Sequence, residues 1–380
     1  MAAVRRIGFN LLSVIPRMVG GAETAAVELL DELANQRPGD LEYVLFCLDG
    51  FPREHPDIVS RFDVRTLPVS GRARSLRVLA ENSWLAAQAR RSGIDLLHHL
   101  GNVLPPVPGV PGVVTVYDLQ PFDLPGNFSR IKTAYLRAVA PGSARRARLV
   151  ITPSEFARRS VIDRFGVDPA RVRTVPLGAG AAGPGVPAAE AGRRYGLPGR
   201  WFAFNAVTAP HKNHATLLRA FAQVAEKEPE VSLVLTGGPA QTEDAVRGDI
   251  DRLGLAGRVV RTGRIPRADM IGILRGAVAL TFPSRYEGFG LPVLEAMNLG
   301  TPVLAANATA LPEVVGAGGR LLEPMDVDAW AQAMLELLGD DVARTRLIDA
   351  GRRRAAELSW ATAAERTVEV YRDALYAARA

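Results

Sequence analysis

Short apolar runs alternate with amphipathic, helix-like segments along most of the chain. The continuous run at 113–116 (VVTV) is typical of a strand that is buried on both faces of a parallel sheet. A first strand, a glycine turn at Gly20 and Gly21 and a helix over 24–36 open the series. The pattern then predicts strands at 42–48, 63–69, 95–100, 112–119, 148–154 and 172–178, and helices at 75–92, 129–143 and 155–165. This alternation predicts an α/β fold with a doubly wound parallel sheet.

A glycine- and proline-rich segment over 178–187 (GAGAAGPGVP) interrupts the pattern and is typical of a linker. A second series follows, with strands predicted at 201–207, 231–236, 259–265, 278–283 and 301–306, helices at 215–227, 241–253, 267–274 and 292–299, and a helical tail from 326. We therefore expect two Rossmann-like domains, 1–180 and 181–358, with the carboxyl ends of both strand sets facing a central cleft.

Composition narrows the class of protein. The 380 residues are 48% hydrophobic and 23% charged, as in an ordinary globular chain. A single cysteine, Cys47, excludes a disulfide framework, and the five histidines lack metal-ligand spacing. No apolar run reaches the ~18 residues that a membrane-spanning helix needs. The first residues loosely resemble a secretory leader, but Asn10 and Ser13 interrupt the apolar run, so we expect no cleavage.

Positive charge is concentrated in the first half of the chain. Residues 1–180 carry 23 Lys and Arg against 17 Asp and Glu, a net charge of +6, whereas residues 181–380 carry 23 of each. Such a half could contact an anionic membrane or bind an acidic substrate, although a solvated arginine-rich surface explains the same pattern. Only Lys132, Lys212 and Lys227 are lysines among the 46 basic residues, so a lysine inside a motif is informative.

The most informative segment is 282–296 (FPSRYEGFGLPVLEA). A predicted strand ends there, Gly288 and Gly290 free the following loop to direct backbone N–H groups at a ligand, and Pro292 suits the first turn of a helix. Glu287 precedes the loop and Glu295 is expected on the first turn of the helix, with both carboxylates facing one cleft. The alternative is that these carboxylates only complement the helix dipole.

Three further patterns are weaker. Lys212 in the segment PHKN follows a predicted strand and precedes a helix, where a phosphate could bind, although an ordinary loop fits equally well. Gly20 and Gly21 could likewise admit an anion or simply form a turn. The GxGxxG match at 178–183 is followed by prolines, so no helix opens there and no dinucleotide site is expected.

Two Asp-x-Asp matches, at 249–251 and 326–328, lack the context of a metal site. The first lies inside a predicted helix, and Asp326 is better interpreted as a helix N-cap. We therefore expect no metal ion and no cofactor.

Taken together, these segments resemble the retaining GT-B glycosyltransferases of family GT4, over nearly the whole chain. Glu287 and Glu295 match the Glu-x7-Glu motif of that family in its EGFGLPxLEA form. Kinship is nearest to bacterial mannosyl- and rhamnosyltransferases of polysaccharide or glycolipid synthesis. The resemblance implies a hexosyltransferase that uses a nucleotide-diphosphate sugar as donor substrate. It also implies that a C-terminal helix, 359–380, crosses back to the first domain.

Carried over by position, the resemblance implies the following roles. Lys212 would contact the donor diphosphate, Glu287 the sugar hydroxyls and Glu295 the ribose. Backbone groups of the loop Gly288, Phe289, Gly290 and Leu291 would meet the sugar and phosphate. Gly20 and Gly21 would touch the phosphate from the acceptor side, and Ile265 would flank the base.

Two positions depart from the family pattern. Tyr117 and Asp118 stand where the family commonly has His-Asp, and a tyrosine is a poor base at neutral pH. His98 and His99, at the end of another predicted strand, are candidates to take over part of that role. An arginine usually lies six residues before the lysine, but this chain has Ala206, and Arg285 is the candidate substitute.

Two other functions remain open on the sequence alone. One is a GT-B phosphorylase or sugar-phosphate synthase with the same donor site, and the other is a nucleotide-sugar-binding pseudoenzyme subunit. The expected partners are the nucleotide-sugar donor, a glycan, lipid-linked or small-molecule acceptor, and an anionic membrane surface, with no nucleic acid. The expected location is cytoplasmic, peripheral to the inner face of the membrane.

Overall fold

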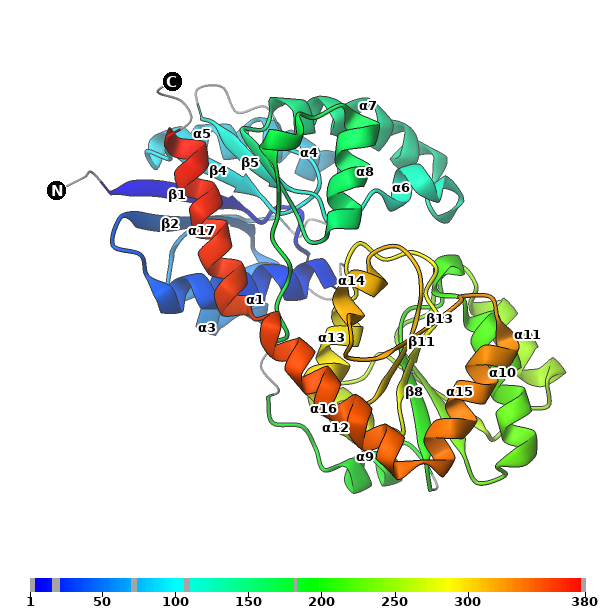
Figure 1. Cartoon of the computed structure of the whole chain (residues 1–380). Helices are drawn as coiled ribbons and strands as arrows, with labels where there is room; N and C mark the ends of the chain where they lie inside the picture. Colours follow the sequence, from blue (N-terminus) through cyan, green and yellow to red (C-terminus); the bar gives the residue numbers. More distant parts are fainter. Residues whose placement is uncertain are drawn as a thin grey trace. The chain divides into compact units, whose positions relative to one another are not determined.

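The computed structural model describes residues 4–15, 21–69, 74–105, 110–180, 183–197 and 199–376. The chain forms two compact units, one of Met1–Leu177 with Trp360–Ala380 and one of Gly178–Ser359 (Figure 1). Each unit is built on its own parallel sheet. The doubly wound α/β class predicted from the strand and helix alternation is confirmed for both units.

The first unit has a seven-stranded sheet in the order β3-β2-β1-β4-β5-β6-β7, with every pairing parallel. Its strands are β1 (Arg5–Asn10), β2 (Leu41–Leu48), β3 (Asp63–Leu67), β4 (Leu96–His99), β5 (Gly112–Thr115), β6 (Leu149–Thr152) and β7 (Val172–Thr174). The strand order reverses between β1 and β4, which makes this pair the topological switch point of the unit.

Helices form the crossover connections that parallel strands require. They are α1 (Gly21–Gln36), α2 (Gly50–Glu54), α3 (Pro56–Val59), α4 (Arg74–Asn82), α5 (Trp84–Arg91), α6 (Gln120–Asp123), α7 (Arg130–Arg146), α8 (Glu155–Phe165) and α17 (Trp360–Tyr376), with short 3-10 turns η1 (Pro125–Asn127) and η2 (Pro169–Arg171). The C-terminal helix α17 packs against α1 and β4, so the last part of the chain belongs to the first unit (Figure 1).

The second unit has a six-stranded sheet in the order β10-β9-β8-β11-β12-β13, again parallel throughout. Its strands are β8 (Trp201–Asn205), β9 (Ser232–Thr236), β10 (Val259–Gly263), β11 (Leu280–Phe282), β12 (Val303–Ala306) and β13 (Arg320–Leu322). Here the order reverses between β8 and β11. The aromatic rings of Phe204 and Phe282, one from each of these strands, meet edge to face at 5.7 Å.

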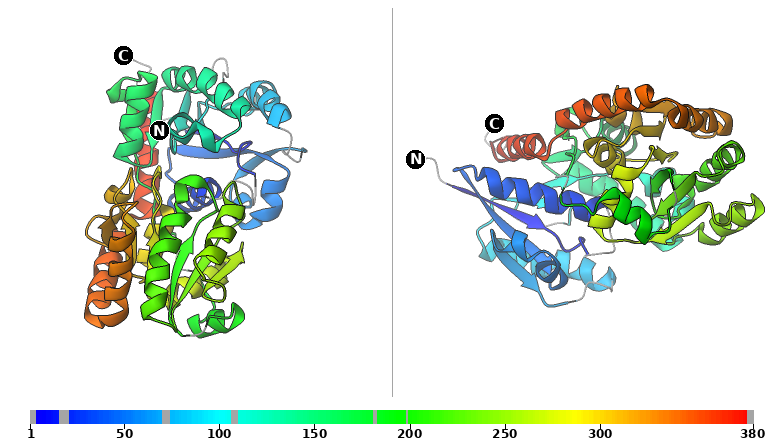
Figure 2. Two further views of the ribbon diagram at one scale, coloured as in Figure 1. Left: turned by 90° about the vertical axis from the view of Figure 1, so that its right-hand side faces the viewer. Right: turned by 90° about the horizontal axis from the view of Figure 1, so that it is seen from below.

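Helices lie along the second sheet and are seen from two further sides in Figure 2. They are α9 (Ala188–Arg194), α10 (His214–Lys227), α11 (Glu243–Arg252), α12 (Arg267–Gly276), α13 (Leu291–Asn298), α14 (Leu311–Val315), α15 (Val327–Gly339) and α16 (Asp341–Glu357), with the 3-10 turn η3 (Pro210–Lys212). The carboxylate of Asp326 accepts the N–H of Ala329 at 3.0 Å, so the predicted N-cap is confirmed.

Several elements differ from the sequence-based expectation. The single helix expected over 75–92 is two helices, α4 and α5, separated at Ser83, whose hydroxyl bonds back to the carbonyl of Leu79 at 2.7 Å. The strand expected over 112–119 ends at Thr115, so Tyr117 and Asp118 lie in the loop beyond it. Strand β13 was not expected from the pattern, because three residues are too few to show a period.

Within the part of the chain that the structure describes, no helix combines the length and the apolar character needed to cross a membrane.

Candidate active site

The switch point of the second unit brings together the loops that follow β8 and β11. In open α/β sheets, ligands bind outside the carboxyl ends of the strands at such a point, because the helices that leave it diverge to opposite faces. The loop after β8 carries η3 and ends at Lys212. The loop after β11 carries Glu287 and the glycines before α13. The two most informative sequence motifs therefore lie at one place in the fold.

Lys212 and Glu287 form an ion pair across this switch point. The Lys212 Nζ lies 2.5 Å from the Glu287 Oε1, and the side chains are only 15% and 14% exposed. The Lys212 Nζ also lies 5.3 Å from the centroid of the Phe282 ring. The pair is 75 residues apart in sequence. Because both side chains are mostly buried at a ligand-binding edge of the sheet, a charged or hydroxylated ligand could replace one member of the pair and bind the other.

Asn213 ties the two loops to each other and to a third. Its amide nitrogen donates to the carbonyl of Pro283 at 3.1 Å and to that of Pro324 at 2.7 Å. Its amide oxygen accepts the hydroxyl of Thr216 at 2.9 Å. Asn213 has a positive φ of 60°, which Asn tolerates better than most residues. This residue fixes the position of its neighbour Lys212, and the sequence analysis missed it.

Thr309 anchors the loop that carries Glu287. The Glu287 N–H donates to the Thr309 hydroxyl at 2.9 Å. Thr309 has a φ of 52°, which is unusual for a β-branched residue and strained. Gly290, at a φ of 122°, has no room for a side chain, since a Cβ would lie 2.8 Å from Leu311. Gly288 is half-buried, Phe289 is buried, and Leu291 begins α13.

Two buried histidines flank Lys212. Burial, together with the Lys212 charge, lowers the pKa of His211 to about 4. The same two causes lower the pKa of His214 to about 4, and the His214 ring lies against Phe204. Both imidazoles are therefore neutral at pH 7. Lys212 is the only cation that this short segment supplies, and the exposed Arg285 adds a second nearby, donating to the carbonyl of Pro210 at 3.1 Å.

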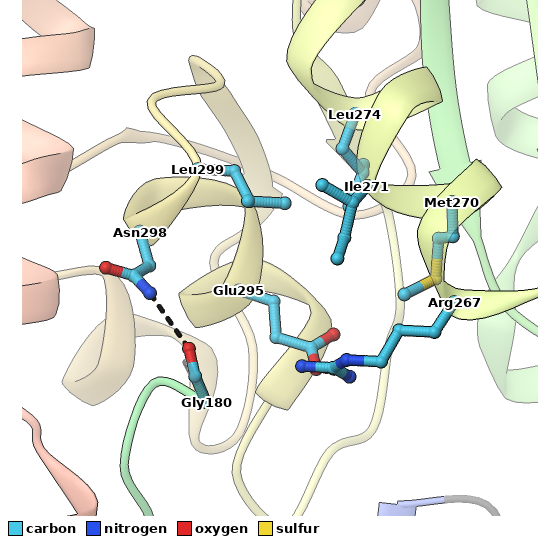
Figure 3. Close-up of a pocket in the computed structure, with 8 residues that line it drawn as sticks. All are labelled: Gly180, Arg267, Met270, Ile271, Leu274, Glu295, Asn298 and Leu299. Carbon is cyan, nitrogen blue, oxygen red and sulfur yellow. Dashed lines mark hydrogen bonds and ion pairs between the residues drawn. The ribbon is translucent and has the colours of Figure 1, made fainter. Parts of the chain in front are cut away.

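Glu295 lies in a small pocket of the same unit (Figure 3). Its carboxylate pairs with the guanidinium of Arg267 at 3.2 Å, and Figure 3 shows the two groups side by side. Burial raises the pKa of Glu295, and Arg267 opposes that effect. The rest of the lining is Gly180, Asn298 and four apolar side chains: Met270, Ile271, Leu274 and Leu299. The pocket has a volume of only about 10 Å³, which is room for one water molecule and not for a sugar ring.

The expected place of Glu295 needs a correction. It is the fifth residue of α13 and lies on the second turn rather than the first, because the helix begins at Leu291. Its partner Arg267 was not foreseen, since nothing in the sequence relates the first residue of α12 to α13. Ile265 lies half-buried between β10 and α12, two residues before Arg267.

In the first unit, Tyr117 and Asp118 follow β5. The Tyr117 N–H donates to the Asn102 side-chain oxygen at 2.9 Å, and Asp118 accepts the N–H of Gln120 at 3.0 Å. Burial raises the pKa of Tyr117 far above its usual value, so the phenol stays protonated. Tyr117 also lines a small enclosed cavity with His98 and Trp360. The phenol can donate a hydrogen bond but cannot serve as a base at neutral pH.

His98 and His99 are wrong candidates for a polar group presented to a sugar. His98 is fully buried, and its Nδ1 and Nε2 lie 2.7 Å from the Tyr371 hydroxyl and 2.8 Å from the Thr115 hydroxyl. His99 is 1% exposed, and its Nδ1 contacts Asn10. Burial lowers the pKa of both to about 3. His98 instead joins the sheet to α17.

Of the two N-terminal glycines, Gly20 lies outside the described residues, and Gly21 is the exposed first residue of α1. A Cβ on Gly21 would meet no atom within 4 Å, so space alone does not require glycine there. Among the described residues, no group of three or more His, Cys, Asp and Glu side chains is arranged to hold a metal ion.

Comparison with known proteins identifies the family. Residues 199–354 match the family model of glycosyl transferases group 1, and residues 19–179 match that of glycosyltransferase family 4. The chain is 30% identical over 293 residues to the O-antigen chain mannosyltransferase B of Escherichia coli, with 75% of this chain and 76% of that protein covered. It is 34% identical over 237 residues to the MMP alpha-(1->4)-mannosyltransferase of Mycolicibacterium hassiacum, and this alignment covers 61% of this chain and 56% of that protein.

Solved structures show the same fold. Anabaena Alr3699/HepE, in complex with UDP and glucose, aligns with a TM-score of 0.75 at 22% identity, over 97% of this chain and 100% of that one. Two Rossmann-like units with a lysine and a Glu-x7-Glu segment in the second define a GT-B glycosyltransferase. The chain belongs to the group 1, family 4 glycosyltransferases, and it is a hexosyltransferase.

Proposed function

We propose that this enzyme transfers a hexose, mannose or a similar sugar, from a nucleotide-diphosphate donor to a hydroxyl of a glycan or lipid-linked acceptor, with retention at the anomeric carbon. The observation that carries the proposal is the Lys212–Glu287 ion pair at the switch point of the second unit. The relatives named as mannosyltransferases favour mannose over other hexoses.

The transfer needs positive charge beside the diphosphate that leaves the donor. The bond from the anomeric carbon to the diphosphate oxygen breaks, the bond to the acceptor oxygen forms, and the proton of the acceptor hydroxyl passes to the leaving diphosphate. Negative charge therefore grows on the diphosphate while the sugar becomes oxocarbenium-like. Lys212 and the backbone N–H groups of the loop before α13 are the groups that would stabilise the leaving diphosphate. Glu287 would then accept sugar hydroxyls, and Glu295 would accept those of the ribose.

On this proposal the enzyme needs neither a metal ion nor a cofactor, because Lys212 and the loop N–H groups supply the positive potential. We further propose that it works at the cytoplasmic side of a membrane, where anionic lipids would attract the basic first half of the chain.

A donor panel tests the proposal directly. Purified UDP-glucose, UDP-N-acetylglucosamine and GDP-mannose are each added to the enzyme, and the change in melting temperature is measured. We expect one of the sugars to raise the melting temperature in the wild type and to lose most of that effect in Glu295→Ala. Equal, small shifts with all three donors would contradict a nucleotide-sugar site.

A further inference from the structure

Arg267, the first residue of α12, forms an ion pair with Glu295 of the neighbouring helix α13. The Arg267 Nη1 lies 3.2 Å from the Glu295 Oε1, and the two side chains lie side by side in Figure 3. The Glu295 side chain is 13% exposed, whereas the Arg267 side chain is 45% exposed. The pair therefore joins a mostly buried carboxylate to a guanidinium that keeps much of its contact with water.

The surroundings of the Glu295 carboxylate are mainly apolar, because Met270, Ile271 and Leu274 of α12 line the same pocket. An unpaired charge in such a place is costly, so a carboxyl group there tends to stay protonated. Burial accordingly raises the pKa of Glu295, and the charge and hydrogen bond of Arg267 lower it. The protonation state of Glu295 thus depends on Arg267.

The other charged groups near the pocket are engaged elsewhere. Asp269 of α12 is bonded to side chains at the end of α9. Arg275, also of α12, lies beside the linker that precedes α9, and Arg264 lies against the loop after β9. Glu295 is the one ionisable residue of α13, and the linker carries none. Among the residues that the structure describes, Arg267 is therefore the charged partner of Glu295.

The ion pair leaves Glu295 able to accept further hydrogen bonds. An ionised carboxylate offers about four acceptor sites on its two oxygens, whereas a protonated carboxyl group turns one of them into a donor. The contact with Arg267 is made at Oε1. The two hydroxyl groups of a ribose are donors, and their hydrogen bonds to a charged acceptor are stronger than those to a neutral one.

We propose that Arg267 is a positioning residue of the donor site, which holds the Glu295 carboxylate as an oriented, charged acceptor for the ribose hydroxyls. This inference rests on the proposed function, in which Glu295 binds the ribose of the nucleotide-sugar donor. Arg267 acts through Glu295 and contacts no reacting atom. Lysine at this position keeps the charge, whereas glutamine keeps a polar side chain without it.

Donor binding at two pH values tests the inference. Full-length wild type, Arg267→Gln and Arg267→Lys are titrated by calorimetry with GDP-mannose and with UDP-glucose at pH 6 and pH 8.5. Relative to the wild type, we expect Arg267→Gln to bind donor about tenfold more weakly at pH 6 and within about threefold at pH 8.5. Arg267→Lys should stay within about threefold at both. His211 and His214 do not titrate in this range, because burial lowers the pKa of each to about 4.

Arg320 provides a matched control in the same unit. It is 42% exposed and pairs with Glu336, which is itself 45% exposed and so stays ionised in water without its partner. Arg320→Gln should therefore leave donor affinity unchanged at both pH values. Glu295→Gln is the second control: it cannot titrate, so its weakened donor binding should be the same at pH 6 and pH 8.5.

A measurement without donor tests the ion pair itself. In Arg267→Gln the pKa of Glu295 in the folded chain lies above its value in the unfolded chain, so the folded chain binds more protons and stability falls as the pH rises. The melting temperature of Arg267→Gln, relative to that of the wild type, should therefore be lower at pH 8.5 than at pH 6. In the double variant with Glu295→Gln this difference should disappear.

Each outcome decides one question. If Arg267→Gln weakens donor binding equally at both pH values, or not at all, the role of Arg267 is wrong and the donor site stands. If the wild type binds neither donor, the proposed function fails, while the melting temperatures still decide whether Arg267 keeps Glu295 charged. If Arg267→Gln alone does not fold, the double variant is compared with Glu295→Gln: equal donor affinity supports the inference, and a further loss overturns it.

Discussion

Replacing Lys212 by methionine separates the chemical role of the lysine from its structural one. Methionine keeps most of the side-chain volume and removes the charge. If Lys212 stabilises the diphosphate as it leaves, its loss should lower turnover about 10²–10³-fold, as the loss of one preorganised electrostatic group does in other enzymes. The same change also affects stability, because Glu287 loses its partner.

The size of the stability effect follows from burial. Glu287 is 14% exposed, so an unpaired carboxylate there costs about 1–3 kcal/mol. In a unit of this size each kcal/mol lowers the melting temperature by about 2–4 °C, which predicts a fall of roughly 2–12 °C. Lys227→Met is the matched control, since Lys227 is an exposed lysine at the end of α10 in the same unit. It should change neither quantity.

A double-mutant cycle decides between the two roles. Glu287→Gln combined with Lys212→Met leaves no unpaired charge, so we expect the melting temperature to recover toward that of the wild type. Turnover, measured by the release of nucleoside diphosphate with and without acceptor, should remain low. Recovery of turnover together with stability in the double variant would refute the reasoning, because Lys212 would then serve only to neutralise Glu287.

Four further outcomes are expected. Glu295→Ala should weaken donor binding by about 1–3 kcal/mol in a calorimetric titration, and an unchanged dissociation constant would remove the ribose role. If the loop after β5 meets the sugar as the family resemblance implies, Asp118→Asn should lower turnover more than Tyr117→Phe, since only the first change removes a charge; wild-type rates in both would assign this loop to packing. Activity should survive EDTA, and a loss that magnesium reverses would contradict this. Burial lowers the pKa of His98 and His99 to about 3, so below pH 6.5 the unfolded chain takes up protons that the folded chain does not. The free energy of unfolding should therefore fall by about 2 kcal/mol per histidine between pH 7 and pH 5. Equal urea midpoints at the two pH values would disprove this.

Local pattern was enough to predict much of the second unit. The segment from β11 to α13 has a buried strand, a glycine loop and a helix start in unbroken succession, so Glu287 and Glu295 could be placed in the fold before any contact was known. Partners far away in the sequence could not be found this way. Arg267 and Thr309 reach the site through tertiary packing, and Thr309 does so in a strained backbone conformation that no propensity predicts.

The histidines show the opposite error. A pair of imidazoles at a strand end suggests chemistry, because the sequence does not show what packs over them. Helix α17, more than 250 residues later, supplies the Tyr371 hydroxyl that is hydrogen-bonded to the His98 Nδ1. The wrong length of the strand that begins at Gly112 has a similar origin: buried residues occur as far as Leu119, but pairing with β6 ends at Thr115. Hydrophobicity predicts burial there, and pairing decides what is strand.

The switch point of the second unit explains why a lysine rather than an arginine suits position 212. In each unit, the loops after the two strands that flank the reversal in strand order meet, and Lys212 lies at this place in the second unit. There, Lys212 is paired and 15% exposed, which suits a cation that must act in a dry site on a charge that appears during reaction. A chain with arginine at 43 of its 46 basic positions keeps a compact, flexible ammonium there. Lys212→Arg is therefore informative, with Lys227→Arg as its control: we expect arginine at 212 to lower turnover, because a planar guanidinium cannot replace a point charge between Glu287 and the Phe282 ring, whereas arginine at the exposed position 227 should leave turnover unchanged. Wild-type turnover in Lys212→Arg would show that any cation suffices at this place.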